Sequence, residues 1–169
     1  MAILEIVTYP DEPLRSKAEP VLEVTDEIRK LVTDMAETMY AAPGVGLAAN
    51  QVGVKKRVAV IDTEEPEGES ELIVLINPKI VARSGDLDWN EGCLSFPGMR
   101  VIVERSAQVT VRALNLDGEP FELQGEDFLA VAIQHEIDHL DGITLADKVS
   151  FLKKRMMIRE LRKNKRQQD

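Results

Sequence analysis

The sequence predicts an α+β fold in which antiparallel or mixed sheets wrap around one central helix. Two observations favour this class. Short segments with strand patterns fill the middle of the 169-residue chain, and clear helical spacing lies before and after them. Strands and helices that are segregated along a chain in this way are typical of α+β proteins. There is no internal repeat and no linker, so residues 1–169 are expected to form a single domain.

The first third of the chain contains one amphipathic helix. Residues 3–24 include three prolines and are expected to run extended across the surface. Thr25 is a good N-cap for a helix that reaches about residue 42. Its apolar positions keep helical spacing and should face the core: Ile28, Leu31, Val32, Met35 and Met39.

A glycine-rich segment at residues 43–53 follows this helix. It does not fit a dinucleotide-binding loop, because such a loop follows a strand and opens a helix. The segment instead offers backbone that a ligand can approach closely, with Gln51 as an uncharged amide donor. An ordinary turn is the alternative interpretation.

The strands expected in the middle of the chain are short. They cover residues 57–62, 72–77, 79–83, 100–104, 107–113 and 121–123, with a turn at 115–118. The acidic segment at 63–71 is expected to be a solvated loop.

A helix expected at residues 128–140 carries both histidines of the chain. His135 and His139 are four residues apart, so both imidazoles lie on one helix face and can aim at one point, with Glu136 beside them. This HExxH spacing is typical of zinc hydrolases. Asp141 and Gly142 give a C-cap signal that ends the helix. The alternative is a buried helix whose histidines are only hydrogen-bonded.

A catalytic metal centre needs a third protein ligand, and Cys93 is the sole thiol. It lies in a segment punctuated by glycine and proline rather than in an apolar run. Two His and one Cys with an open fourth position would form a catalytic site. One alternative is that Cys93 is a small buried hydrophobe. Another is a thermolysin-like peptidase with Glu160 as third ligand, although basic neighbours make an intrahelical ion pair its simpler role.

The charge is distributed unevenly along the chain. The formal net charge is −9, yet residues 148–169 hold nine Lys and Arg against two acids, a net +7 that leaves −16 on residues 1–147. Such asymmetry indicates a tail with its own partner. We expect a helix to about Lys163, either docked by Leu152 and Met156 as a solvated end or in contact with RNA. A structural-metal module that holds RNA through this tail is therefore the alternative to an enzyme.

The composition limits the class of protein and the compartment in which it is expected to work. With 44% hydrophobic and 30% charged residues the chain is ordinary for a globular protein, and its acidity argues against DNA binding. It has no apolar run of membrane-spanning length and no secretory signal, and a lone cysteine suits a reducing compartment. We therefore expect a cytoplasmic protein without a membrane partner.

Three segments resemble the signature motifs of the peptide deformylase family. They are GVGLAANQVG at 44–53, EGCLSFPG at 91–98 and QHEIDHLDG at 134–142. Their order and spacing resemble the short bacterial form, and the likeness covers essentially the whole chain. The resemblance implies hydrolysis of the N-formyl group from the formyl-methionine that begins nascent polypeptides, with release of formate.

The resemblance also assigns roles to individual residues. The implied metal ligands are Cys93, His135 and His139, and the implied catalytic carboxylate is Glu136. The implied oxyanion donors are the Gln51 side chain and the Leu94 N–H. The substrate site would be lined by Val45, Gly46, Arg100, Phe128, Val131 and Ala132, the last two near the methionine side chain. Phe96 departs from the family, which often has a smaller branched aliphatic residue there.

The resemblance further implies one divalent ion per chain, Fe(II), with Zn, Ni or Co as substitutes. A metal-bound water would be the nucleophile, and Glu136 would serve as general base and then general acid. The implied substrates are N-formyl-methionyl nascent peptides. Because such peptides emerge at the ribosome, the basic tail at 148–169 is expected to contact ribosomal RNA.

Overall fold

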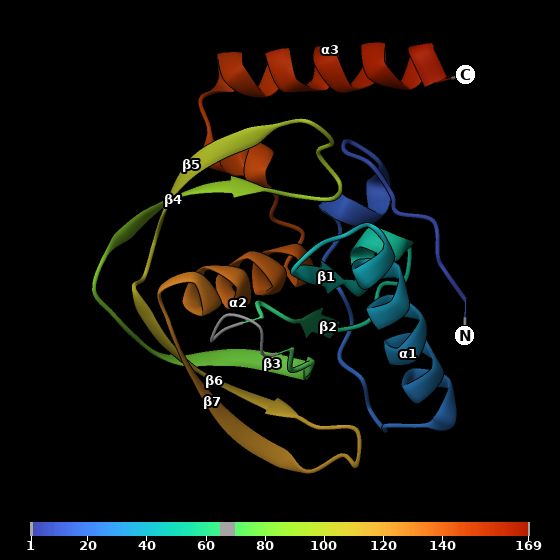
Figure 1. Cartoon of the computed structure of the whole chain (residues 1–169), viewed down its shortest axis with the longest axis vertical. Helices are drawn as coiled ribbons and strands as arrows, with labels where there is room; N and C mark the ends of the chain where they lie inside the picture. Colours follow the sequence, from blue (N-terminus) through green and yellow to red (C-terminus); the bar gives the residue numbers. More distant parts are fainter. Residues whose placement is uncertain (1, 65–69, 169) are drawn as a thin grey trace.

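The computed structural model describes residues 2–64 and 70–168, and in it a central helix lies between two antiparallel sheets (Figure 1). The helix is α2 (Asp127–Leu140). The five-stranded sheet has the order β1-β2-β3-β6-β7 and the small sheet pairs β4 with β5. The strands are β1 (Gly46–Ala48), β2 (Val58–Ile61), β3 (Ile73–Ser84), β4 (Leu87–Gly92), β5 (Arg100–Arg105), β6 (Gln108–Leu114) and β7 (Pro120–Glu126). The α+β prediction is confirmed.

Helix α2 is held on the large sheet by an apolar layer. Ala130 and Ile133 of the helix and Leu75 and Val111 of the sheet are fully buried in one cluster. At Gly125 of β7, a side chain would begin 2.9 Å from the Ile133 methyl carbon, so glycine lets strand and helix approach closely. The predicted end of the helix is confirmed, since Gly142 follows Asp141 with a positive φ of 76°.

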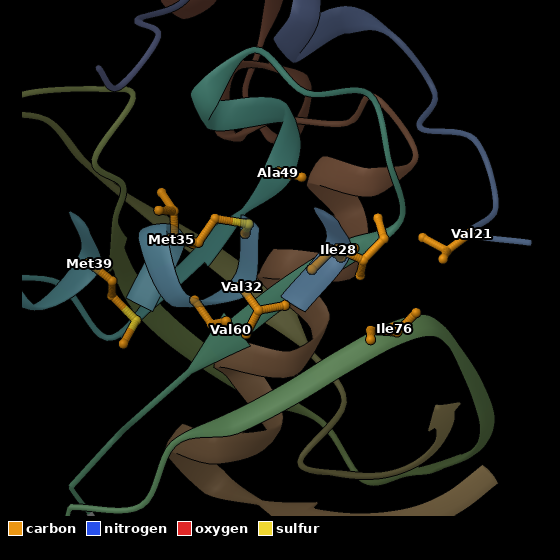
Figure 2. Close-up of a cluster of buried hydrophobic side chains, with 10 residues drawn as sticks. Val21, Ile28, Val32, Met35, Met39, Ala49, Val60 and Ile76 are labelled. Carbon is orange, nitrogen blue, oxygen red and sulfur yellow. The ribbon is translucent and has the colours of Figure 1, made fainter. Parts of the chain in front are cut away.

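Helix α1 (Asp26–Ala41) covers another part of the large sheet. Its predicted N-cap is confirmed, because the Thr25 hydroxyl accepts a hydrogen bond from the Ile28 N–H at 3.3 Å. Met35 and Met39 are fully buried against strand residues such as Val60 and Ile76 (Figure 2). The methionines therefore belong to the core, as their spacing predicted.

Two strand predictions were wrong. Residues 72–77 and 79–83 are not separate strands but belong to the single strand β3, which passes Pro78 with a change of register. Asn77 absorbs the irregularity with a φ of 52°. Strand β4 was not anticipated, because Asp, Asn and Gly make its sequence a poor strand former. Residues 65–69 of the loop expected at 63–71 lie outside the described residues.

The expectation that residues 3–24 run extended across the surface was only partly right, because most of the segment is exposed or half-buried but four of its side chains are buried. Tyr9, Leu14, Ala18 and Val21 are buried, and a short 3-10 helix, η1 (Glu12–Arg15), carries Leu14 into the core. Prolines fix the backbone direction, but apolar side chains at irregular spacing still gain from burial. Tyr9 stacks on Phe96 with 4.9 Å between ring centroids.

The basic C-terminal segment forms helix α3 (Phe151–Gln168), which continues past Lys163, where we expected it to end. Two further 3-10 helices precede it in the chain: η2 (Ala49–Val52), which comes after β1, and η3 (Leu145–Lys148), which comes just before α3. Helix α3 docks through Met157 and Leu161, each 5% exposed, and not through Leu152 and Met156 as expected. Within the described residues, no helix is long and apolar enough to cross a membrane.

Candidate metal centre and active site

Helix α2 and the end of β4 bring three potential metal ligands together. The Nε2 atoms of His135 and His139 are 3.1 Å apart, and the Cys93 Sγ is 3.3 Å from the His139 Nε2. The three ligand atoms lie within 4.8 Å of one another. Both histidines are buried and Cys93 is half-buried, so the cluster lies just below the surface.

This donor set fits a cation. Burial lowers the pKa of both histidines, but the charges of Glu136 and Cys93 outweigh burial at His135, whose pKa is raised. The pKa of His139 stays lowered by burial and by His135. The two ring nitrogens and the Cys93 sulfur lie close enough together for one ion to be bound by all three, through the lone pair of each atom.

A buried ion-pair network orients His135 from behind. Its Nδ1 lies 2.8 Å from the Glu91 carboxylate, which accepts two further hydrogen bonds from Arg105 at 2.7 and 2.8 Å. Arg105 also donates to Asp138 at 2.5 Å. Burial raises the pKa of Glu91, but the hydrogen bonds from Arg105 and His135 outweigh burial and lower it. An anionic Glu91 keeps the proton of His135 on Nδ1 and leaves Nε2 free to bind metal.

The carboxylate of Glu136 lies beside the ligands in a confined position. One of its oxygens is buried without a hydrogen-bond partner in the described part of the chain. Burial raises its pKa to about 7, and the neighbouring His135 opposes this only in part. Gly46 of β1 packs against it so closely that any side chain at position 46 would collide with the carboxylate. A glycine is therefore required where β1 passes Glu136.

The amide of Gln51 is oriented by its own hydrogen bonds. Its oxygen accepts from the Ala48 N–H at 3.0 Å, so its nitrogen points the other way. That nitrogen donates to the Ser95 hydroxyl at 3.1 Å and lies 3.5 Å from the Cys93 sulfur. The amide donor is thus aimed at the cluster.

A pocket of about 520 Å³ opens beside these groups. The residues that the sequence suggested for the site line its wall: Val45, Gly46, Gln51, Cys93, Leu94, Arg100, Phe128, Val131, Ala132, His135 and Glu136. His139, the remaining suggested residue, is 1% exposed and is not on the wall. Glu160, the third ligand of a thermolysin-like peptidase, lies on α3 and is not part of the ligand cluster found among the described residues.

Sequence reasoning missed several residues of the site. Trp89 and Met99 also line the pocket, and Trp89 stacks on Phe128 with 5.2 Å between ring centroids. Glu91 and Arg105 had no assigned role. Glu91 could have been noticed in the sequence, because it lies two residues before Cys93 in the same motif. For Arg105 there is no such signal, since only the pairing of β4 with β5 brings it to Glu91.

An HExxH helix whose histidines meet a cysteine at the wall of a pocket defines a metal-dependent hydrolase. Comparison with known proteins gives the particular family. Residues 3–155 match the family described as polypeptide deformylase, and the chain belongs to that family.

Individual relatives agree along the whole chain. A peptide deformylase of Acidobacterium capsulatum is 52% identical over 166 residues, which is 98% of each chain. A crystal structure of a peptide deformylase from Legionella pneumophila is 47% identical, with a TM-score of 0.92 over 99% of this chain and 98% of that chain. A peptide deformylase from Ehrlichia chaffeensis in complex with actinonin is 42% identical, with a TM-score of 0.93 over 98% of this chain and 99% of that chain.

Proposed function

We propose that this chain hydrolyses the N-formyl group of the N-terminal formyl-methionine of nascent polypeptides and releases formate. The observation that carries the proposal is the meeting of Cys93, His135 and His139 next to Glu136, at a pocket that Cys93, His135 and Glu136 line. Cys93, His135 and His139 would hold one divalent ion. When bound, the ion would act as a Lewis acid and lower the pKa of a water molecule, which makes a nucleophile available at neutral pH.

In this proposal Glu136 moves the proton. Its carboxylate accepts a proton from the attacking water and later passes it to the leaving amine nitrogen. The buried oxygen without a partner is free for this role. Burial that raises the pKa to about 7 also suits the role, because a general base works best with a pKa near the working pH.

Two donors stabilise the negative charge that develops on the formyl oxygen. The Gln51 amide is aimed at the cluster by its bond from Ala48, and the Leu94 N–H follows the ligand Cys93 directly along the chain. One such donor typically contributes about 3 kcal/mol to a transition state. The bond from the Ala48 N–H limits the rotation of the Gln51 amide, and the Leu94 N–H is part of the backbone.

The methionine side chain of the substrate would lie against one face of α2. Phe128, Val131 and Ala132 are spaced three and four residues apart, so they share the helix face that lines the pocket. Val45 and Gly46 also line the pocket. Trp89 lines it as well and stacks on the aromatic ring of Phe128.

The expected metal is Fe(II). A thiolate ligand neutralises part of the charge of the ion, so a tetrahedral zinc bearing Cys93 should be a weaker Lewis acid than one with three imidazoles. We expect formate release from formyl-Met-Ala to be fastest after reconstitution with Fe(II), and slower with Zn(II). The measurement is formate per bound metal for Fe(II), Co(II), Ni(II) and Zn(II). A highest rate with zinc would overturn the iron assignment, and no formate with any ion would overturn the function.

We further propose that residues 1–169 work as one catalytic domain in the cytoplasm, with 148–169 as its basic ribosome-facing helix. The docked side of α3, with Met157 and Leu161, packs in a cluster with Phe96 and Val101 that also touches Cys93. The opposite side carries an arginine stripe, formed by Arg155, Arg159, Arg162 and Arg166 at helical spacing. All four are exposed, so they can reach RNA phosphates while the acidic body faces away.

Reversing three charges of the arginine stripe, Arg155→Glu, Arg159→Glu and Arg162→Glu, is expected to abolish co-sedimentation with ribosomes at low salt. Hydrolysis of formyl-Met-Ala should be unchanged, because the stripe does not line the active-site pocket. The matched control reverses Lys56, Lys79 and Arg83, three exposed cations of the body, with the same total change of charge. If the stripe variant pelleted as well as the control, α3 would be only a solvated terminal helix.

A further inference from the structure

A second hollow continues from the active-site pocket onto helix α3. Met99 and Arg100 line both the pocket and a groove of about 480 Å³ between β5 and α3. The α3 side of this groove is formed by Leu152, Lys153, Met156, Met157 and Glu160. We call this hollow the α3 groove. Figure 1 shows α3 lying across the small sheet, on the opposite side of that sheet from α2.

Two apolar side chains of the α3 groove, Leu152 and Met156, do not hold the helix in place. Leu152 and Met156 are 69% and 62% exposed, whereas Met157 and Leu161 dock α3 and are each 5% exposed. Large apolar side chains gathered on an exposed face beside a pocket typically mark a binding surface. The two exposed side chains are therefore available to a ligand.

The composition of the groove indicates an occupant whose sequence varies. Three of its lining residues are methionines, Met99, Met156 and Met157. Methionine is unbranched and polarisable, so methionine-rich surfaces adapt to apolar side chains of different shapes. Arg100 and Lys153 add two positive charges and Glu160 adds one negative charge, so the groove carries a small excess of positive charge beside its apolar side chains.

The shared wall at Met99 and Arg100 indicates where the occupant comes from. A polypeptide whose first residue lies in the pocket can only continue outward, and extended chain advances about 3.3 Å per residue. Leu152 and Met156 border the arginine stripe, since they lie three residues before Arg155 and Arg159 respectively, so the groove and the stripe lie side by side on α3. The groove therefore adjoins the pocket on a side where the rest of the substrate can continue.

Resting on the function proposed above, we propose that the α3 groove binds downstream residues of the formylated polypeptide whose N-terminal residue occupies the active-site pocket. It receives an apolar side chain of that polypeptide against Leu152 and Met156. Every nascent chain has a different downstream sequence, which is the requirement that adaptable methionines meet.

The test compares formyl-Met-Ala-Ser with formylated nine-residue peptides that carry one Leu among Ser residues, moved along positions four to eight. We expect kcat/KM to rise about fivefold or more when Leu occupies one or two of these positions. The rise should come from a lower KM, and its size is the one expected when one apolar side chain is partly buried. Met156→Asp should remove the rise and leave formyl-Met-Ala-Ser hydrolysis unchanged. Phe151→Asp, the same change at an exposed residue of α3 outside the groove, should keep the rise.

Each outcome decides the matter. Equal kcat/KM for all nine-residue peptides, with normal hydrolysis of formyl-Met-Ala-Ser, would overturn the groove and leave the proposed function intact. A rise that survives Met156→Asp, or that Phe151→Asp also removes, would overturn the groove as well. If the wild-type protein hydrolysed none of the peptides, the proposed function itself would fail. Circular dichroism of both variants checks that the exposed substitutions leave the fold unchanged.

Discussion

Glu136→Gln is expected to lower kcat for formate release by roughly 10²-fold or more, the usual scale for general acid-base catalysis. The amide keeps the shape of the carboxylate but cannot accept and return a proton. Nothing else on the pocket wall can take over, since Glu91, the other carboxylate there, is engaged by Arg105 and His135. Single-turnover formate release and metal content, measured on the same sample, check this expectation.

The metal content of the Glu136→Gln protein should equal that of the wild type, because the ligand cluster does not include Glu136. Glu122→Gln is the matched control, the same change at an exposed carboxylate of β7 that pairs with Arg112. Deformylation by Glu136→Gln at near wild-type rate would falsify the proton-transfer role. Loss of metal from this variant would show instead that Glu136 is a ligand.

Cys93→Ala is expected to lose most of its metal and, with it, more than about 10²-fold of the activity. Removing an outer partner of a ligand already costs 10- to 100-fold in metal affinity, so removing one of three ligands should cost more. Cys93→Asp should retain more metal than Cys93→Ala, because a carboxylate can also bind a divalent ion. Elemental analysis after dialysis measures both.

Glu160→Gln is the control for metal content, since it removes the third ligand that a thermolysin-like peptidase would use. This variant should keep its metal, because Glu160 lies on α3, away from the ligand cluster. Stoichiometric metal in Cys93→Ala would remove Cys93 from the ligand set. Loss of metal from Glu160→Gln alone would restore the peptidase alternative.

The features that could be predicted from the sequence are those set by neighbours along the chain. The helical spacing of α1, its Thr25 cap and the aim of His135 and His139 all depend on residues within a turn or two. Cys93 could be singled out because the chain has no other thiol. These local patterns also carry the resemblance to the family.

The features that could not be predicted depend on contacts distant in sequence. Strand β4 has a weak strand sequence and exists because β5 pairs with it, and Arg105 finds Glu91 only through that pairing. The prediction of which side of α3 docks was wrong because docking also depends on contacts distant in sequence. Leu152 and Met156 are as apolar as Met157 and Leu161, so only the position of the cluster around Tyr9 and Phe96 decides which pair is buried.

The network of Arg105 with Glu91, Asp138 and His135 has a consequence for how this protein can change over evolutionary time. Removing one member of a buried ion pair leaves an uncompensated charge and typically costs about 3–5 kcal/mol, a large part of the stability of a domain. Lysine cannot replace Arg105, because it lacks the planar fork that reaches two carboxylates at once. These positions can therefore change only together, whereas a substitution at the exposed Val45 would leave no buried charge without its partner. We therefore expect related sequences to vary more at the mouth of the pocket than in the buried network that supports the metal ligands.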